Sequence, residues 1–125
     1  AWLGRFSGTV AGQYVPYIVP QEHGNKEGLR WLALRDTSGA GLRVQAPRPF
    51  SGSASHFTPE DLAEAYHTSD LQARPEITLC IDAAQRGLGS ASCGPDTLPA
   101  HRIGAGRHDW TFYLQPLRPG DDPAG

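Results

Sequence analysis

The chain has 125 residues, of which 38% are hydrophobic and 19% are charged, and its formal net charge is −2. This composition is typical of one globular domain, and the weakly acidic balance excludes the basic surface of a nucleic-acid-binding protein. No apolar run approaches the ~20 residues that cross a bilayer, and the first ten residues lack the pattern of a signal peptide, so no membrane partner is expected.

Short strand-like segments separated by glycine and proline predict an all-β domain with many turns. They cover residues 13–19, 29–36, 41–46, 76–82 and 108–117, and residues 51–57 could add another short strand. Pro16 makes the first segment an edge strand or a bulge, because proline cannot donate a backbone hydrogen bond.

One short helix is predicted near residues 59–67. Thr58 is a suitable N-cap, Pro59 fits the first helical position, and two acidic residues follow in the first turn. Leu62 and Tyr66 are four residues apart, so they would share one face. This pattern is typical of a helix that packs across the end of a sheet.

The segment GLGSASCGPDTLP, residues 87–99, admits several kinds of site. It fails as a dinucleotide fingerprint, because Ser92 replaces the third glycine and Pro95 prevents the helix that would hold a pyrophosphate. It fails as a nucleophile elbow for the same lack of a helix. Cys93 as a nucleophile, a Cys80–Cys93 disulfide and a rigid turn remain open, although only two cysteines indicate a reducing compartment.

Metal binding and acid catalysis have no sequence signal. The chain lacks the local spacings that assemble zinc ligands from its five histidines, which are His23, His56, His67, His101 and His108. Nothing marks two of its acidic residues as the facing carboxylate pair that a glycosidase needs. We therefore expect no catalytic residue and no metal site in this chain.

Three ordered blocks of sequence resemble the C-terminal domain of glycoside hydrolase family 2 β-galactosidases. They are YVPYIVPQEHGNKEGLRWLAL, FSGSASHFTPEDLAEAYHTSDL and ITLCIDAAQRGLGSASCGPDTLP. Together they cover roughly residues 4–117. His23 stands where this family usually has asparagine.

The resemblance implies an antiparallel β-sandwich, part of a galactose-mutarotase-like supersandwich, over residues 1–118. The composition of the last residues, 119–125, predicts a disordered tail. The chain would be a detached part of a cytoplasmic enzyme that hydrolyses terminal β-D-galactosides such as lactose. Its partners would be the remaining domains of the parent enzyme and the galactoside. The two catalytic glutamates would lie in an absent barrel domain, and Mg and Na would be bound in other domains.

The same resemblance implies a role for the loop over residues 87–96 in lining the leaving-group subsite. The residues that would line it are Ser92, Cys93, Gly94 and Pro95. The best-studied enterobacterial member of the family carries tryptophan at about the position of Cys93, whereas this chain matches the branch with SCGPD. It would therefore lack an indole platform for the leaving-group sugar.

Two other functions were weighed against this one. A free-standing carbohydrate-binding module could use Trp31, Trp110 and Tyr113 as a stacking platform, although Trp110 lies on the predicted core face of its strand. A mutarotase-like epimerase would need a paired histidine and glutamate in a cleft. A galactoside titration followed by tryptophan fluorescence separates the binding module from the enzyme part.

The predicted strands present more apolar surface than one partial sandwich can cover. Their apolar faces consist of Leu29, Trp31 and Ala33; Ile77, Leu79 and Ile81; and Trp110, Phe112 and Leu114. Because upstream strands are missing from the expected sandwich, one side of a sheet should lie bare. We expect the isolated chain to cover this surface by forming a homodimer.

Overall fold

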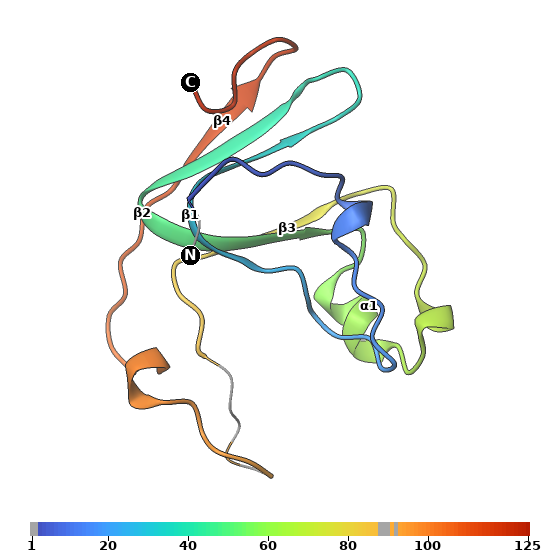
Figure 1. The fold of residues 1–125 in the computed structure, drawn as a ribbon, viewed down its shortest axis with the longest axis vertical. Coiled ribbons are helices and arrows are strands. Elements are labelled where there is room, and N and C mark those ends of the chain that lie inside the picture. The colour runs from blue at the N-terminus through green and yellow to red at the C-terminus, as the bar shows by residue number, and fades with distance from the viewer. Residues whose placement is uncertain (1–2, 88–90, 92) are drawn as a thin grey trace. The chain divides into compact units, whose positions relative to one another are not determined.

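The computed structural model describes residues 3–87, 91 and 93–125, and their regular structure is mostly β (Figure 1). The strands are β1 (Lys26–Arg35), β2 (Gly41–Ser55), β3 (Thr78–Asp82) and β4 (Tyr113–Leu117), and the α-helix is α1 (Pro59–Glu64). Three short 3-10 turns are η1 (Ala11–Gln13), η2 (Thr68–Asp70) and η3 (Pro99–His101). The prediction of an all-β fold is confirmed.

The described strands form one four-stranded sheet in which β2 is the central element. The order is β1-β2-β3, and β4 also pairs with β2 (Figure 1). The β2–β4 pairing is antiparallel and aligns Val44 with Leu114. The β1–β2 hairpin closes through a 2.9 Å bond from Asp36 N to Ala40 O, and Gly39 supplies the positive φ of 88° that the turn requires.

Two compact units divide the chain, and the division falls inside β1, β2 and β3. One unit consists of Ala1–Lys26 and Gly52–Cys80, and the other of Glu27–Ser51 and Ile81–Gly125. The buried hydrophobic residues of the first are Leu62 and Ala65, and those of the second are Val44, Phe50 and Leu117. Each unit therefore has a small core of its own.

The prediction of a strand over residues 13–19 is wrong. This part of the chain contains η1 and then runs without strand pairing to Pro20. Pro16 and Pro20 remove two backbone donors, and the residue before each proline is restricted as well, so a ladder is not sustained here. The apolar side chains of Val15, Ile18 and Val19 consequently stay exposed.

Residues 41–46 and 51–55 belong to one strand rather than two. β2 continues through Pro47 and Pro49, which lie between the two predicted segments. These prolines are two residues apart, so their missing N–H groups point toward the same edge of the strand. They lie beyond Gly41–Gln45, where β4 pairs, so they cost β2 no bond to that strand.

The start of the predicted helix is confirmed, and its end is not. Thr58 caps α1, and its Oγ1 accepts a 3.1 Å bond from Asp61 N. The helix stops at Glu64 because Asp70 Oδ2 accepts from the backbone N–H groups of Tyr66 and His67 instead. Tyr66 therefore lies outside the helix, 78% exposed, and does not share a face with Leu62.

Asp61 ties the helix start to a distant residue of the same unit. Arg74 donates from Nε to Asp61 Oδ2 at 2.6 Å and from Nη2 to Oδ1 at 2.7 Å. Thr58 N also donates to Asp61 Oδ2, at 2.9 Å. These bonds, the guanidinium of Arg74 above all, hold the pKa of the Asp61 carboxyl well below its usual range.

We therefore expect Asp61 to make the stability of the chain pH-dependent. Its folded-state pKa is lower than the unfolded value of about 3.9, so the stabilisation is complete above that value and is lost as the pH falls below it. Asp61→Asn should lower the denaturation midpoint at neutral pH, and the difference from wild type should shrink in acid. Denaturant titrations at about pH 6 and about pH 2.5 measure this. A midpoint difference that is equal at both values would contradict the assignment.

More surface is exposed than a compact protein of this size leaves open. The chain exposes 9562 Å². A globule of its mass exposes about 6,500 Å², and two separate compact bodies of half that mass would together expose about 7,900 Å². Large hydrophobic side chains that stay exposed include Phe6, Ile18, Ile77, Phe112 and Leu114. Of the predicted apolar faces, Ile77, Phe112 and Leu114 are exposed, whereas Leu29, Trp31, Leu79 and Ile81 are half-buried.

The last residues, 119–125, make hydrogen bonds to β1 and β2 of the same unit. Arg35 Nη2 donates to Asp121 O, and Arg43 Nη1 donates to Gly125 O at 2.9 Å.

Among the described residues, no helix combines the length and the apolar character needed to cross a membrane.

Candidate functional site

The candidate site is the loop that leaves the sheet after β3 and returns at η3. Of the residues predicted to line a sugar subsite, Cys93, Gly94 and Pro95 are exposed. Ser92 lies outside the described residues. No disulfide joins Cys80 to Cys93 in the part of the chain that the structure describes. Cys80 is half-buried in β3, whereas Cys93 is exposed on the loop.

One carboxylate holds both ends of this loop together. Asp96 Oδ1 accepts from Arg86 Nη2 on the outgoing side, and Asp96 Oδ2 lies 3.0 Å from Arg102 Nη2 on the returning side. The backbone N–H of Thr97 also donates to Asp96 Oδ1, at 2.7 Å. Charge-assisted contacts of this kind are shorter and stronger than hydrogen bonds between neutral groups. We call Arg86, Asp96, Thr97 and Arg102 the loop clamp.

Thr97 is the buried centre of the loop clamp, with 1% of its surface exposed. Its Oγ1 donates to Gly87 O at 2.7 Å and accepts from Arg86 Nε at 3.2 Å. Its backbone oxygen accepts from Arg102 Nε at 2.6 Å. Thr97 therefore joins the outgoing side of the loop, through its hydroxyl, to Arg102 after η3, through its carbonyl oxygen.

Gly87 stands where the backbone passes closest to η3. Its N–H donates to His101 O at 3.0 Å. A Cβ atom at Gly87 would lie 2.8 Å from His101 Cβ and 3.2 Å from Thr97 Cγ2, so no side chain fits without movement. The steric need for glycine is thus at the base of the loop, whereas Gly94 at its outer part has open space around it.

We expect Gly87→Ala to destabilise the chain by about 1–3 kcal/mol, the usual cost of overpacking a closed contact. Gly94→Ala is the matched control, because its added methyl group meets nothing within 4 Å. Thermal unfolding of the two variants measures the difference. Equal losses for both variants would show that the loop base is not closely packed.

The loop clamp was missed by the sequence analysis. Its members are separated by up to sixteen positions, from Arg86 to Arg102, and no local motif links them. The available signal was the charge pattern, with one arginine on each side of a glycine-rich segment and a single aspartate before its end. The sequence analysis left a rigid turn open for this segment, but it did not single out Asp96 or Thr97 as the residues that hold the loop.

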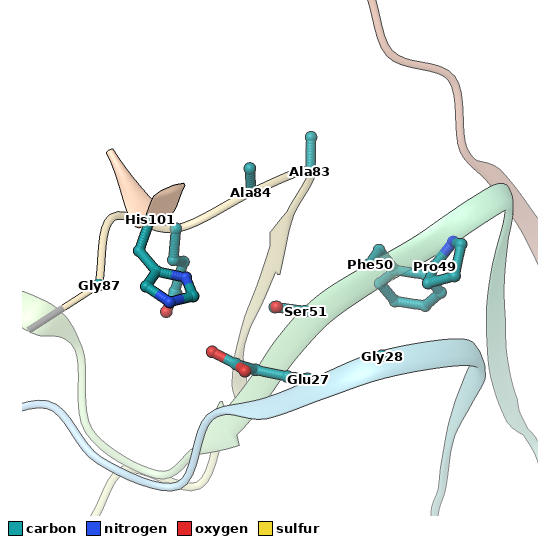
Figure 2. Close-up of a pocket in the computed structure, with 10 residues that line it drawn as sticks. Glu27, Gly28, Pro49, Phe50, Ser51, Ala83, Ala84, Gly87 and His101 are labelled. Carbon is teal, nitrogen blue, oxygen red and sulfur yellow. The ribbon is translucent and has the colours of Figure 1, made fainter. Parts of the chain in front are cut away.

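Beside the base of the loop lies a cavity of about 320 Å³ in the same unit (Figure 2). Gly87 contributes to its wall together with Glu27 from β1, Phe50 and Ser51 from β2, and His101 from η3. None of these residues was singled out for this place by the sequence. They come from three distant parts of the chain, so only the fold brings them together.

Comparison with known proteins gives a consistent result. A family model described as "Beta galactosidase small chain" matches residues 1–114. A β-galactosidase of Actinobacillus pleuropneumoniae is 36% identical over 101 residues, covering 81% of this chain and 10% of that protein. A β-galactosidase of Streptococcus thermophilus is 32% identical over 124 residues, covering 94% of this chain and 12% of that protein.

A third relative, β-galactosidase BgaC of Bifidobacterium adolescentis, is 38% identical over 92 residues, which cover 71% of this chain and 9% of that protein. The chain therefore spans about a tenth of the length of these curated relatives.

Proposed function

This chain belongs to the β-galactosidase small chain family, and we propose that it is a non-catalytic part of an enzyme that hydrolyses terminal β-D-galactosides such as lactose. The observation that carries the proposal is the match of nearly the whole chain to about a tenth of each of several β-galactosidases. Within that enzyme, which we assign to glycoside hydrolase family 2, the chain supplies scaffold and one loop of the sugar site.

The loop is the part of the chain that we propose to meet substrate. Cys93, Gly94 and Pro95 are exposed, so they are available to a neighbouring group. The loop clamp supports them from a fixed base, which is what a substrate-positioning wall requires. We propose that Ser92, Cys93, Gly94 and Pro95 line the leaving-group subsite.

The acid and the nucleophile are proposed to come from other domains. A glycosidase needs one carboxyl group that keeps its proton until it protonates the leaving group. Hydrogen bonds from the Ser38 hydroxyl and from Arg74 lower the pKa of Asp36 and Asp61 respectively, so both carboxylates stay ionised. These two groups therefore serve the turn and the helix start. Mg and Na are likewise proposed to be bound in other domains.

The exposed apolar side chains are proposed to be covered by the remaining domains of the parent enzyme, which we place in the cytoplasm. Ile77, Phe112 and Leu114 are each exposed by more than a third. A second sheet of a sandwich, supplied from outside this chain, would cover exposed apolar side chains of this kind. In isolation the same surface favours a homodimer.

A free-standing carbohydrate-binding module is the alternative, and the position of Trp110 argues against it. The Trp110 ring lies 6.4 Å from Phe50 and 5.1 Å from Phe112, and its Nε1 is buried. Phe50 is itself 2% exposed. Trp110 therefore packs toward the core of its unit and does not form an open stacking platform with Tyr113.

The proposed place of the loop is tested by Cys93→Trp in the complete enzyme. An indole there would stack on the leaving-group sugar, worth roughly 0.5–1.5 kcal/mol, so the KM for lactose should fall about 2- to 12-fold. The KM for a galactoside with a small alkyl leaving group should change little. Ala63→Trp, at an exposed position of α1, is the control. Equal changes for both substrates would argue against this placement.

A further inference from the structure

The cavity at the base of the loop has the composition of a site for a small polar ligand. Its volume of about 320 Å³ is at the lower end of the range for small-molecule sites, roughly 300–1,000 Å³. One wall is apolar and includes Pro49 and Phe50, and Ala83 and Ala84 lie on another side. This size suits a ligand of about one sugar ring.

Three polar side chains converge on this space from separate elements. Figure 2 shows the Glu27 carboxylate, the Ser51 hydroxyl and the His101 imidazole directed toward the same interior. Ser51 is 8% exposed, so its hydroxyl is buried apart from its access to the cavity. Gly28 has a φ of 67°, and no atom lies within 4 Å of the position that a Cβ would take there. The space beside Glu27 is therefore open.

The hydrogen-bonding capacity of these three side chains is not used by other side chains in the part of the chain that the structure describes. Within residues 3–87, 91 and 93–125, no side-chain hydrogen bond or ion pair engages Glu27, Ser51 or His101, whereas the neighbouring Arg86 and Arg102 are occupied by Asp96. A carboxylate, a hydroxyl and an imidazole provide acceptors and donors at one place. They remain available to a ligand.

The chemistry of this set selects a neutral polyhydroxylated ligand. Glu27 disfavours an anion, and among the described residues no three metal-ligating side chains gather, so a cation has too few ligands here. A pyranose offers hydroxyl groups for Glu27, Ser51 and His101. Its C–H face fits the apolar wall at Pro49 and Phe50.

We propose that this cavity is a saccharide subsite that takes one pyranose unit, such as a further sugar of an extended β-galactoside. The inference rests on the proposed function, which it deepens by adding a second sugar contact to the loop. Gly87 belongs both to the wall of the cavity and to the loop base, where its carbonyl oxygen accepts from Thr97 Oγ1.

Amide NMR of this chain tests the proposal directly. We expect methyl β-galactoside and β-1,4-galactobiose to shift the amide signals of Ser51, Gly87 and His101 with saturable millimolar affinity. Glu27→Gln should weaken binding roughly tenfold, the loss expected for a hydrogen bond to a charged group. Glu27 is exposed, so the substitution preserves the fold. Glu64→Gln, at an exposed position of α1, should leave the affinity unchanged.

Two outcomes overturn the proposal. One is the absence of shifts at Ser51 and Gly87 with both saccharides. The other is a pair of equalities: wild type and Glu27→Gln bind the saccharides with the same affinity, and wild type binds the acyclic polyol sorbitol as tightly as it binds the saccharides. Failure of the proposed function is recognised separately, because it is read from the activity of the assembled enzyme. An assembled enzyme that hydrolyses lactose while the chain binds no saccharide refutes the subsite alone.

Discussion

The chain by itself should release no detectable product from a chromogenic β-galactoside. The proposed function leaves it without a general acid and without a nucleophile, and removing both together leaves almost no catalysis. The measurement is product release at high protein concentration, in a preparation from a host that lacks β-galactosidase. Turnover at even about one thousandth of a complete enzyme's rate would show that a catalytic pair exists within these residues.

In the assembled enzyme, Asp96→Ala should lower kcat/KM for lactose by up to about 100-fold, because a misplacement of about 1 Å at a positioning element has costs of this size. The substitution removes the carboxylate that Arg86 and Arg102 share, so both ends of the loop lose their common anchor. Asp96 acts through the loop rather than on the sugar. The loss should therefore be larger for lactose than for a galactoside with a small alkyl leaving group.

Two further variants separate positioning from general damage. Asp96→Asn keeps the size of the side chain and should retain part of the activity. Asp109→Ala removes a comparable ion pair, with Arg107, from a site where the aspartate side chain is 71% exposed, and it should leave kcat/KM unchanged. Equal losses for Asp96→Ala and Asp109→Ala, or equal losses on both substrates, would contradict a role of the loop clamp in positioning.

Local chemistry made the start of α1 predictable. Thr58, Pro59 and the following acidic residues act within one turn of backbone, so their effect can be read from neighbouring positions. The end of the helix depends on Asp70, which captures the N–H groups of Tyr66 and His67. That competition is between segments, and the helical pattern of the sequence contains no sign of it.

The strands show the same division between local and distant causes. A period of two in the apolar residues located β3, and a short run that is apolar on both faces located β1. Residues 13–19 have similar apolar content but do not pair with a strand in the described structure. Pro16 has no backbone N–H, so it cannot donate a hydrogen bond to a neighbouring strand. Continuity of β2 through two prolines depends on which edge they face, and this follows from pairing rather than from composition.

The loop was recognisable, but its support was not. The resemblance of residues 87–99 to a family block indicated a structured loop near a sugar. The groups that hold it, Asp96 and Thr97, and those that form the cavity beside it, Glu27 and His101, meet only after the chain has folded. Side chains that come together across long sequence separations carry no spacing that a single sequence reveals.

The central claim is that this chain completes a β-galactosidase whose catalytic groups lie outside it. The most direct measurement is reconstitution: a β-galactosidase relative is prepared without the residues that match this chain, and lactose hydrolysis is followed as the chain is added. We expect the two parts to be inactive separately and lactose hydrolysis to rise saturably when they are mixed. The Asp96→Ala chain should restore much less activity than the wild-type chain. Stable association of the two parts without any gain in lactose hydrolysis would contradict it.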